Sequence, residues 1–201
     1  MKKIKVYSRS REGDTWDKMK TFIPYEIECA RVWGYDSWRG ALYYLLDILS
    51  SDDDYIVNVD IDCFIYDWSI VNRIVSQLDE STMVFAGMPD NFENSPHRFG
   101  NYNQTNPFFN VFKVKECRRI VNQISMDELN SFQKEPFEKL FEKLFEYGRL
   151  DLKGETHSDG ISTILANSMI HTWYSRDAEH QPRIETRFQE SLELWKKNKE
   201  L

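Results

Sequence analysis

The stretch Tyr55-Ile-Val-Asn-Val-Asp60-Ile-Asp62-Cys-Phe-Ile-Tyr-Asp67 is an apolar, β-branched run interrupted by two aspartates at positions i and i+2. Residues two apart share one face of an extended strand, so Asp60 and Asp62 are expected to point together, roughly 6–7 Å apart. Neighbouring carboxylates repel each other, and burying them unpaired is costly. Hard cations such as Mg²⁺ and Mn²⁺ bind carboxylate oxygens and leave positions open for phosphate. The stretch therefore predicts a metal–diphosphate site at the end of a strand.

Length and composition favour one globular domain over residues 1–201. Apolar residues make up 41% of the 201 residues and charged residues 29%, which is enough for a core and a soluble surface. The net charge of −7 argues against a nucleic-acid-binding protein, which needs a basic face. The chain shows neither a secretion signal at its start nor an apolar run of the roughly 18 residues that span a membrane. We expect a cytoplasmic protein without a transmembrane segment.

The cysteines give no sign of a metal or disulfide framework. Cys29, Cys63 and Cys117 are odd in number and far apart, and none belongs to a Cys-x-x-Cys pair. This pattern is typical of reduced thiols in a cytosolic chain.

Strand and helix patterns alternate along the chain. Strands are expected over residues 4–8, 55–62, 82–86, 108–114 and 169–174. Helices are expected over residues 15–32 (interrupted at Pro24), 38–49 (capped by Ser37), 69–78, 115–125, 136–147, 161–167 and 185–199. Residues 88–107 are expected to form a long loop, which in a compact domain is more often functional than idle. The alternation predicts an α/β domain with a mostly parallel sheet, in which ligands bind at the carboxyl ends of strands such as the one before Asp60.

The elements around the two aspartates come in an order found in a known family. The pieces, in chain order, are Trp38-Arg39-Gly-Ala-Leu42 on a helix, the strand with Asp-Ile-Asp, a strand ending in Phe85-Ala-Gly87, and Asn106-Pro-Phe-Phe-Asn110-Val-Phe112. Together they resemble the Asp-x-Asp region of GT-A glycosyltransferases. These enzymes transfer a sugar from a nucleotide-diphosphate donor. The resemblance implies a GT-A-like (Rossmann-like) fold and a transferase of the hexosyltransferase class, acting on a saccharide, lipid or protein acceptor.

The resemblance also implies a cofactor, Mn²⁺ or Mg²⁺, and a set of ligands. Asp62 would bind the metal directly, and Asp60 would act through the ribose of the donor or a metal-bound water. Several GT-A enzymes use a late histidine as a further ligand. In this chain that ligand would be His180, with His171 as the alternative.

Four further residues are candidates for binding the donor. Arg9 and the nearby Arg11 follow the first strand and could line the nucleotide pocket. Arg39 lies at a helix start, where backbone N–H groups favour a phosphate, although a surface ion pair is the alternative. The resemblance assigns Asn110, in the acceptor-side strand, to donor binding as well.

Asp159, in His157-Ser-Asp159-Gly160, is the candidate catalytic carboxylate. An inverting transferase needs a base for the acceptor hydroxyl, and a retaining one needs stabilisation of an oxocarbenium-like centre. The alternative is that Asp159 simply caps the helix predicted after it. Asp67 is expected to cap the helix over residues 69–78 in the same way.

Two other functions compete. The short segment before Asp60 would suit a non-catalytic nucleotide- or sugar-binding domain. A phosphatase resembling the haloacid dehalogenase group would use Asp60 as nucleophile and Asp62 as acid. That group needs a later acidic pair after an apolar strand, which this sequence does not offer.

Overall fold

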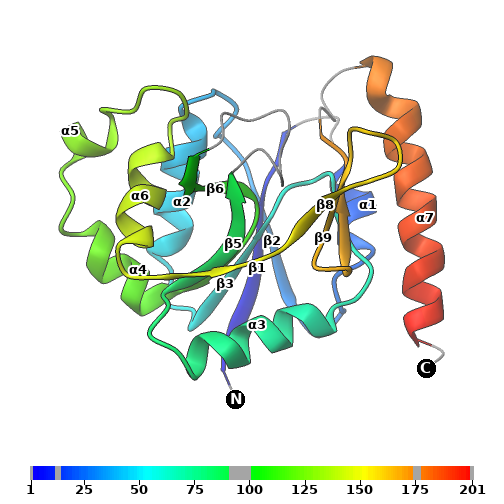
Figure 1. The fold of residues 1–201 in the computed structure, drawn as a ribbon, viewed down its shortest axis with the longest axis horizontal. Helices are drawn as coiled ribbons and strands as arrows, with labels where there is room; N and C mark the ends of the chain where they lie inside the picture. The colour runs from blue at the N-terminus through cyan, green and yellow to red at the C-terminus, as the bar shows by residue number, and fades with distance from the viewer. Residues whose placement is uncertain (1, 12–14, 91–100, 174–177, 200–201) are drawn as a thin grey trace.

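A six-stranded sheet with the order β2-β1-β3-β6-β5-β7 forms the centre of the computed structural model, which describes residues 2–11, 15–90, 101–173 and 178–199 (Figure 1). β6 runs opposite to the other five strands, so the expected mostly parallel α/β sheet is confirmed. The strands are β1 (Ile4–Arg9), β2 (Glu28–Val32), β3 (Tyr55–Val59), β5 (Phe85–Asp90), β6 (Asn101–Lys113) and β7 (Arg149–Asp151).

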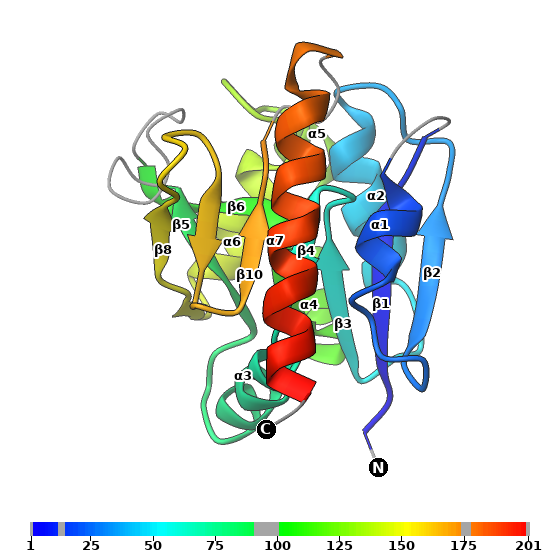
Figure 2. The same ribbon diagram turned by 90° about the vertical axis from the view of Figure 1, so that its right-hand side faces the viewer.

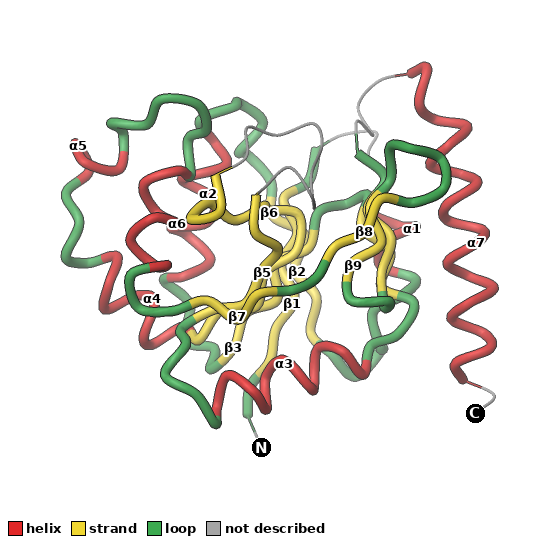
Figure 3. Tube along the Cα trace, in the orientation of Figure 1, coloured by secondary structure: helices red, strands yellow, loops and turns green. Residues whose placement is uncertain are grey.

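Helices cover both faces of this sheet (Figure 3). On one face, Ile56 of β3 packs in a cluster with α2 (Gly40–Leu49), α4 (Val114–Val121) and α6 (Glu138–Phe145). On the other face, Val57 and Val59 pack with α1 (Trp16–Lys20) and α3 (Ser69–Asp79). Because successive strand residues point to opposite faces, β3 is buried on both sides, and its sequence is apolar apart from Asn58. The short helix α5 (Met126–Leu129) packs beside α6.

A second, antiparallel sheet lies beside the first. Its order is β4 (Cys63–Ile65), β10 (Met169–His171), β9 (Thr163–Leu165) and β8 (Gly154–Thr156). Helix α7 (Gln181–Lys199), preceded by the 3-10 turn η1 (Ala178–His180), runs along this small sheet and contacts β4 and β10 (Figure 2). None of the described helices is both long and apolar enough to cross a bilayer.

Two of the helices expected from the sequence are wrong in part or in whole. Residues 28–32 are not helical but form β2, an edge strand that pairs in parallel with β1. Residues 161–167 form a turn and β9, which pairs with β8 and β10. Ala166 and Asn167, at φ of 51° and 50°, lie at the centre of a tight turn before β10, in which the Ser168 N–H donates to the Leu165 carbonyl at 3.0 Å. In both segments, pairing with neighbouring strands outweighs local helix propensity.

The long loop expected over residues 88–107 is also wrong in part. Residues 88–90 belong to β5 and residues 101–107 to β6, where Thr105 pairs with Pro89. Residues 91–100 lie outside the described residues, as does residue 174 of the expected strand over 169–174. The cap expected from Ser37 is confirmed, because its Oγ accepts the backbone N–H of Gly40 at 3.0 Å. The backbone N–H of Ser69 likewise donates to Asp67 Oδ1 at 3.0 Å, at the start of α3.

Candidate metal and donor site

A tight turn follows β3 and carries both aspartates. The backbone N–H of Asp60 donates to the Phe108 carbonyl at 2.7 Å, and the N–H of Cys63 donates back to the Asp60 carbonyl at 3.0 Å. The strand therefore ends at Val59, and the expectation that Asp60 and Asp62 share one face of an extended strand is wrong. The turn, rather than the strand period, gathers the two carboxylates.

His171 joins them from the small sheet. One ligand atom from each of Asp60, Asp62 and His171 lies within 4.8 Å of the others, and we call this group the inner cluster. His171 Nε2 is 3.2 Å from Asp62 Oδ1, and both side chains are buried. β10 places His171 opposite Cys63 of β4, directly after Asp62. Among the described residues this is the only group of three or more potential ligands that converges in this way.

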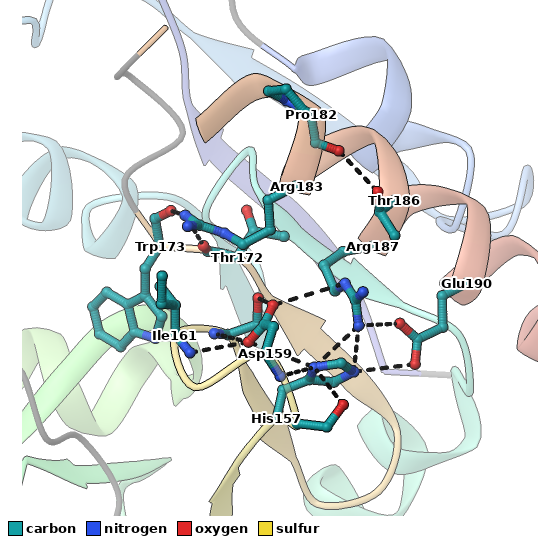
Figure 4. A network of polar contacts seen from close by, with 12 residues as sticks. His157, Asp159, Ile161, Thr172, Trp173, Pro182, Arg183, Thr186, Arg187 and Glu190 are labelled. Atoms are coloured by element: carbon teal, nitrogen blue, oxygen red, sulfur yellow. Dashed lines mark hydrogen bonds and ion pairs between the residues drawn. The ribbon is translucent and has the colours of Figure 1, made fainter. Parts of the chain in front are cut away.

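Two aromatic rings hold His171, together with Arg183, whose hydrogen bonds to two backbone carbonyls we call the clamp. Its imidazole stacks on Phe108 with ring centroids 4.2 Å apart and contacts Trp173 at 4.3 Å. The Arg183 guanidinium of α7 donates to the carbonyl of Thr172 at 2.8 Å and to that of Trp173 (Figure 4). The N–H of Thr172 donates to the Asp62 carbonyl at 3.0 Å. The histidine is thus positioned by the same segment that is tied to the aspartate turn.

A cavity of about 430 Å³ opens beside the inner cluster. It lies at the carboxyl ends of β1 and β3, where ligands bind in open α/β sheets. Its other walls come from α2, from the middle of β6 and from the segment before α6, and they include Trp38, Ala41, Leu45, Asn106, Pro107, Glu135, Pro136 and Phe137. The volume suits a small-molecule ligand.

Burial and the negative charge of the two aspartates raise the pKa of two neighbouring groups, Tyr44 and Cys63. Burial raises the pKa of the Tyr44 hydroxyl well above its usual value, and the Asp60 carboxylate raises it further. Burial also raises the pKa of the Cys63 thiol, with the Asp62 and Asp60 carboxylates adding to the shift. Cys63 is a free, buried cysteine and does not belong to the inner cluster.

The inner cluster fits a divalent cation. An octahedral site with bonds of about 2.1 Å separates adjacent ligand atoms by about 3 Å, which matches the 3.2 Å between His171 Nε2 and Asp62 Oδ1. Two carboxylates and one imidazole form a mixed oxygen and nitrogen donor set. Mg²⁺ prefers oxygen alone, whereas the softer first-row metals accept imidazole as well. The imidazole in the donor set is thus more favourable for a first-row transition metal than for Mg²⁺.

No family model matches the sequence, and no curated protein matches it either. Solved structures do match in shape. A β-1,4-galactosyltransferase 7 from Drosophila, in complex with manganese, UDP-Gal and xylobiose, aligns with 90% of this chain and 74% of its own, at a TM-score of 0.52 and 12% identity. The galactosyltransferase LgtC, with donor and acceptor sugar analogs, aligns with 73% of this chain and 72% of its own, at 0.51 and 13%.

A third match is a glycosyltransferase involved in the glycosylation of the major capsid of PBCV-1. It aligns with 74% of this chain and 81% of its own, at a TM-score of 0.50 and 12% identity. The chain has the GT-A fold. The resemblance seen in the sequence is therefore confirmed for the fold, and at these identities the comparison shows the fold alone.

Within the GT-A fold, the residues expected to bind the donor fall in different places. Arg9, at the end of β1, lines the cavity together with Asp60 and Asp62. Arg39 is exposed just before α2 and lies over the Phe132 ring, outside the described lining of the cavity. Asn110 is fully buried, also outside that lining, and its amide bonds to Asn58 and to the carbonyl of Asn106.

The two late histidines are separated by the structure. His171 belongs to the inner cluster, whereas His180 lies in η1, where its ring contacts Arg183 and Glu179. The residue that the sequence analysis kept as the alternative is thus the one beside the aspartates. The histidines could not be ranked from sequence, because only the pairing of β4 with β10 places His171 there.

Asp159 lies in a different group, which we call the α7 cluster: His157, Asp159, Arg187 and Glu190 (Figure 4). Its Oδ1 accepts the backbone N–H groups of Ile161 and Ser162 at 2.9 and 2.7 Å. Burial alone would raise the pKa of Asp159, but hydrogen bonds from Ser162 and Ile161 outweigh it and hold the pKa below its usual value. Asp159 is not among the described residues that line the cavity, so its catalytic role stays a prediction.

Sequence reasoning gave no role of their own to Asn58 in β3 and Asn106 in β6. Asn58 is buried, accepts from the Tyr44 hydroxyl at 2.8 Å and bonds to the Asn110 amide at 3.2 Å. Asn106 lies on the wall of the cavity. A signal was present, because an asparagine within an apolar strand is rare unless its amide has a structural or functional role.

Proposed function

We propose that this chain is a divalent-metal-dependent glycosyltransferase that uses a nucleotide-diphosphate sugar as donor, with residues 1–201 acting as one GT-A domain. The observation that carries the proposal is the convergence of Asp60, Asp62 and His171 beside a cavity at the carboxyl end of β3. A sheet of this fold with a cation-binding group at that edge is suited to hold a diphosphate.

In this proposal the metal is Mn²⁺, held by Asp62 and His171 with Asp60 beside them. A bound divalent cation would neutralise the negative charge that develops on the departing nucleoside diphosphate. The stacking of His171 on Phe108 fixes the imidazole plane, so a ligand atom is presented without loss of side-chain freedom on binding.

Arg9 supplies the complementary positive charge from the chain itself. It lies across the cavity wall at the end of β1, and its charge opposes that of Asp60 in the environment of Tyr44. A guanidinium pairs well with phosphate oxygens, so Arg9 is suited to orient the diphosphate between β1 and β3. Asp60 and Arg9 would then lie on opposite sides of the diphosphate of the donor.

The test is a titration with UDP-, GDP- and CDP-sugars, with and without Mn²⁺, followed by thermal shift and by hydrolysis of the donor. The proposal expects one nucleotide class to stabilise the protein only when Mn²⁺ is present, with slow release of free sugar. Stabilisation without hydrolysis or transfer to any acceptor would instead indicate a binding domain. Release of phosphate from a simple monoester, with no nucleotide preference, would favour a phosphatase.

A further inference from the structure

β6 bulges where it runs beside the inner cluster. Between the pairs Gly87–Asn110 and Pro89–Thr105, β5 advances two residues while β6 advances five, so the surplus lies within residues 106–109. A bulge leaves backbone groups of the longer strand without partners in the ladder. Buried carbonyls in such a segment need hydrogen-bond donors from elsewhere in the chain.

Two asparagine side chains supply these donors. Asn58 of β3 and Asn110 of β6 lie opposite each other in the antiparallel pairing. Asn58 Nδ2 donates to the carbonyl of Pro107 at 2.5 Å and to Asn110 Oδ1 at 3.2 Å, and Asn110 Nδ2 donates to the carbonyl of Asn106 at 3.1 Å. Asn58 Oδ1 accepts from the Tyr44 hydroxyl of α2 at 2.8 Å. Both amide hydrogens of Asn58 are therefore used within the chain, although the residue lines the cavity.

Phe108, the next residue of the bulge, contacts both halves of the inner cluster. Its carbonyl accepts the backbone N–H of Asp60 at 2.7 Å, and its ring stacks on the imidazole of His171 with centroids 4.2 Å apart. Asp60 follows a strand of the large sheet, whereas His171 belongs to the small sheet. The relative position of these two ligands thus depends on where the bulge places Phe108.

We propose that Asn58 is a positioning residue for the inner cluster and acts on it through the bulge and Phe108. The peptide unit that joins Pro107 to Phe108 is planar, so a hydrogen bond from Asn58 to the Pro107 carbonyl directly restrains the backbone of Phe108. Groups that orient metal ligands without touching the metal typically change its affinity 10-fold to 100-fold. The inference rests on the proposed function only in taking the inner cluster as a cation site.

The alternative is that the asparagine network only stabilises the fold. Removing Asn58 would then lower Tm, as the loss of any buried hydrogen bonds does, and would leave cation binding unchanged. Tyr55 provides a matched control, because it is buried in the same strand and its hydroxyl donates to Asp79, away from the cavity lining. Metal affinity therefore distinguishes a positioning role from a purely structural one.

The experiment compares Asn58→Leu with Tyr55→Phe. Mn²⁺ affinity is measured by electron paramagnetic resonance without any donor, and Tm is measured on the metal-free protein. We expect Asn58→Leu to weaken Mn²⁺ binding about tenfold. Pulsed measurements should also show a weaker coupling of the bound ion to the imidazole nitrogen of His171. Tyr55→Phe should lower Tm and leave both metal readouts unchanged.

A double variant tests whether Asn58 acts through Phe108. Phe108→Leu removes the ring that stacks on His171, so it should weaken Mn²⁺ binding by itself. Because the two residues lie on one path, the loss in Asn58→Leu/Phe108→Leu should be smaller than the product of the two single losses. Losses that multiply would mean independent effects and would overturn the proposal.

The remaining results also have defined meanings. Wild-type Mn²⁺ affinity in a folded Asn58→Leu would overturn the positioning role while the proposed function stands. A wild-type protein that binds Mn²⁺ but no nucleotide sugar would overturn the proposed function and leave the positioning role intact, and one that binds no Mn²⁺ would overturn both. If leucine prevents folding, Asn58→Thr, which also lacks the amide, gives the same comparison. Failure of both variants to fold would show that the network is structural and would overturn the proposal.

Discussion

The inner cluster and the α7 cluster contain the same kinds of side chain, since each places two carboxylates around one histidine. They differ in what lies between these groups. In the α7 cluster the Arg187 guanidinium is 2.6 Å from Glu190 and 3.0 Å from His157 Nδ1, so a cation from the chain completes the group. In the inner cluster the ligand atoms face one another beside a cavity.

The comparison teaches that residue types alone do not mark a functional site. The α7 cluster fastens the last helix to the β8–β9 turn, and its arginine compensates the carboxylates that surround it. The inner cluster instead combines converging ligand atoms with space for a small molecule. The sequence around Asp60 and the sequence around Asp159 both contain residue types suited to metal binding or catalysis. Only the surroundings of these side chains in the structure distinguish the two groups.

The largest effect is expected from Asp62→Asn, which removes one charge from the inner cluster and keeps its size. Metal-dependent donor binding should be lost, and donor hydrolysis should fall more than about 100-fold, because the cation loses a direct ligand. Mn²⁺ binding is followed by electron paramagnetic resonance and the fold by circular dichroism. The matched control is Asp52→Asn, an exposed carboxylate before β3. Wild-type turnover in Asp62→Asn would show that the site is elsewhere.

A somewhat smaller effect is expected from His171→Asn. The variant replaces the imidazole ligand with an amide, so affinity for Mn²⁺ should fall about 10-fold to 100-fold and the preference for Mn²⁺ over Mg²⁺ should shrink. Competition titrations with the two metals measure both quantities. His180→Asn is the matched control and should leave them unchanged. The reverse result would restore His180, the ligand first expected from the sequence.

Substitutions of Arg183 and Arg187, both on α7, test whether the inner cluster and the α7 cluster contribute separately to metal binding and to stability. Arg183→Met removes the clamp on the carbonyls of Thr172 and Trp173, so Mn²⁺ affinity should fall several-fold through a less fixed His171. Arg187→Met, one turn further along α7, should lower Tm without changing Mn²⁺ affinity. Both variants are compared by calorimetry and thermal unfolding. Equal losses of affinity would mean that α7 acts only as a whole.

The smallest effect is expected from Asp159→Asn. The variant should lower the free energy of unfolding at pH 7 by about 1 kcal/mol, because the amide is a weaker acceptor for the turn that Asp159 caps. The folded pKa of Asp159 lies below 3.8, so its contribution is complete at neutral pH and is lost as the pH falls through the folded pKa. Urea unfolding at pH 7 and pH 3 should show the difference shrinking in acid.

Donor hydrolysis by the same variant decides between the two interpretations of Asp159. Unchanged hydrolysis is expected for a residue whose oxygens serve a turn. A loss of about 100-fold or more, with Mn²⁺ binding intact, would establish the catalytic role expected from the sequence.

Local patterns predicted those parts of the fold that depend on local physics. The apolar stripe of α6 and the glycine after it predicted a helix, and α6 ends at Phe145, shortly before Gly148, whose φ is +103°. The buried strand before Asp60 followed from its β-branched run. β2 and β9 were missed, because local patterning favoured helix at both segments and only pairing with β1, and with β8 and β10, makes them strands.

The same distinction holds for the candidate site: residues close in sequence could be grouped in advance, and residues brought together by strand pairing could not. Asp60 and Asp62 are two positions apart, so their proximity could be expected from sequence, although a turn and not the strand period brings them together. His171 reaches them only through the antiparallel pairing of β10 with β4. The bulge that places Asn106 on the cavity wall depends on a register shift between β5 and β6, which leaves no simple sequence pattern.

The distance along the chain between Asp62 and His171 has a consequence for how the protein is made. The two residues are 109 positions apart (171 − 62), and a ribosome adds about 5–20 residues per second. The aspartate turn therefore emerges many seconds before the histidine that completes the inner cluster, and α7, with its clamp, follows later still. A nascent chain without β10 cannot assemble the inner cluster, so under the proposed function the cation would bind only after His171 has been made and positioned.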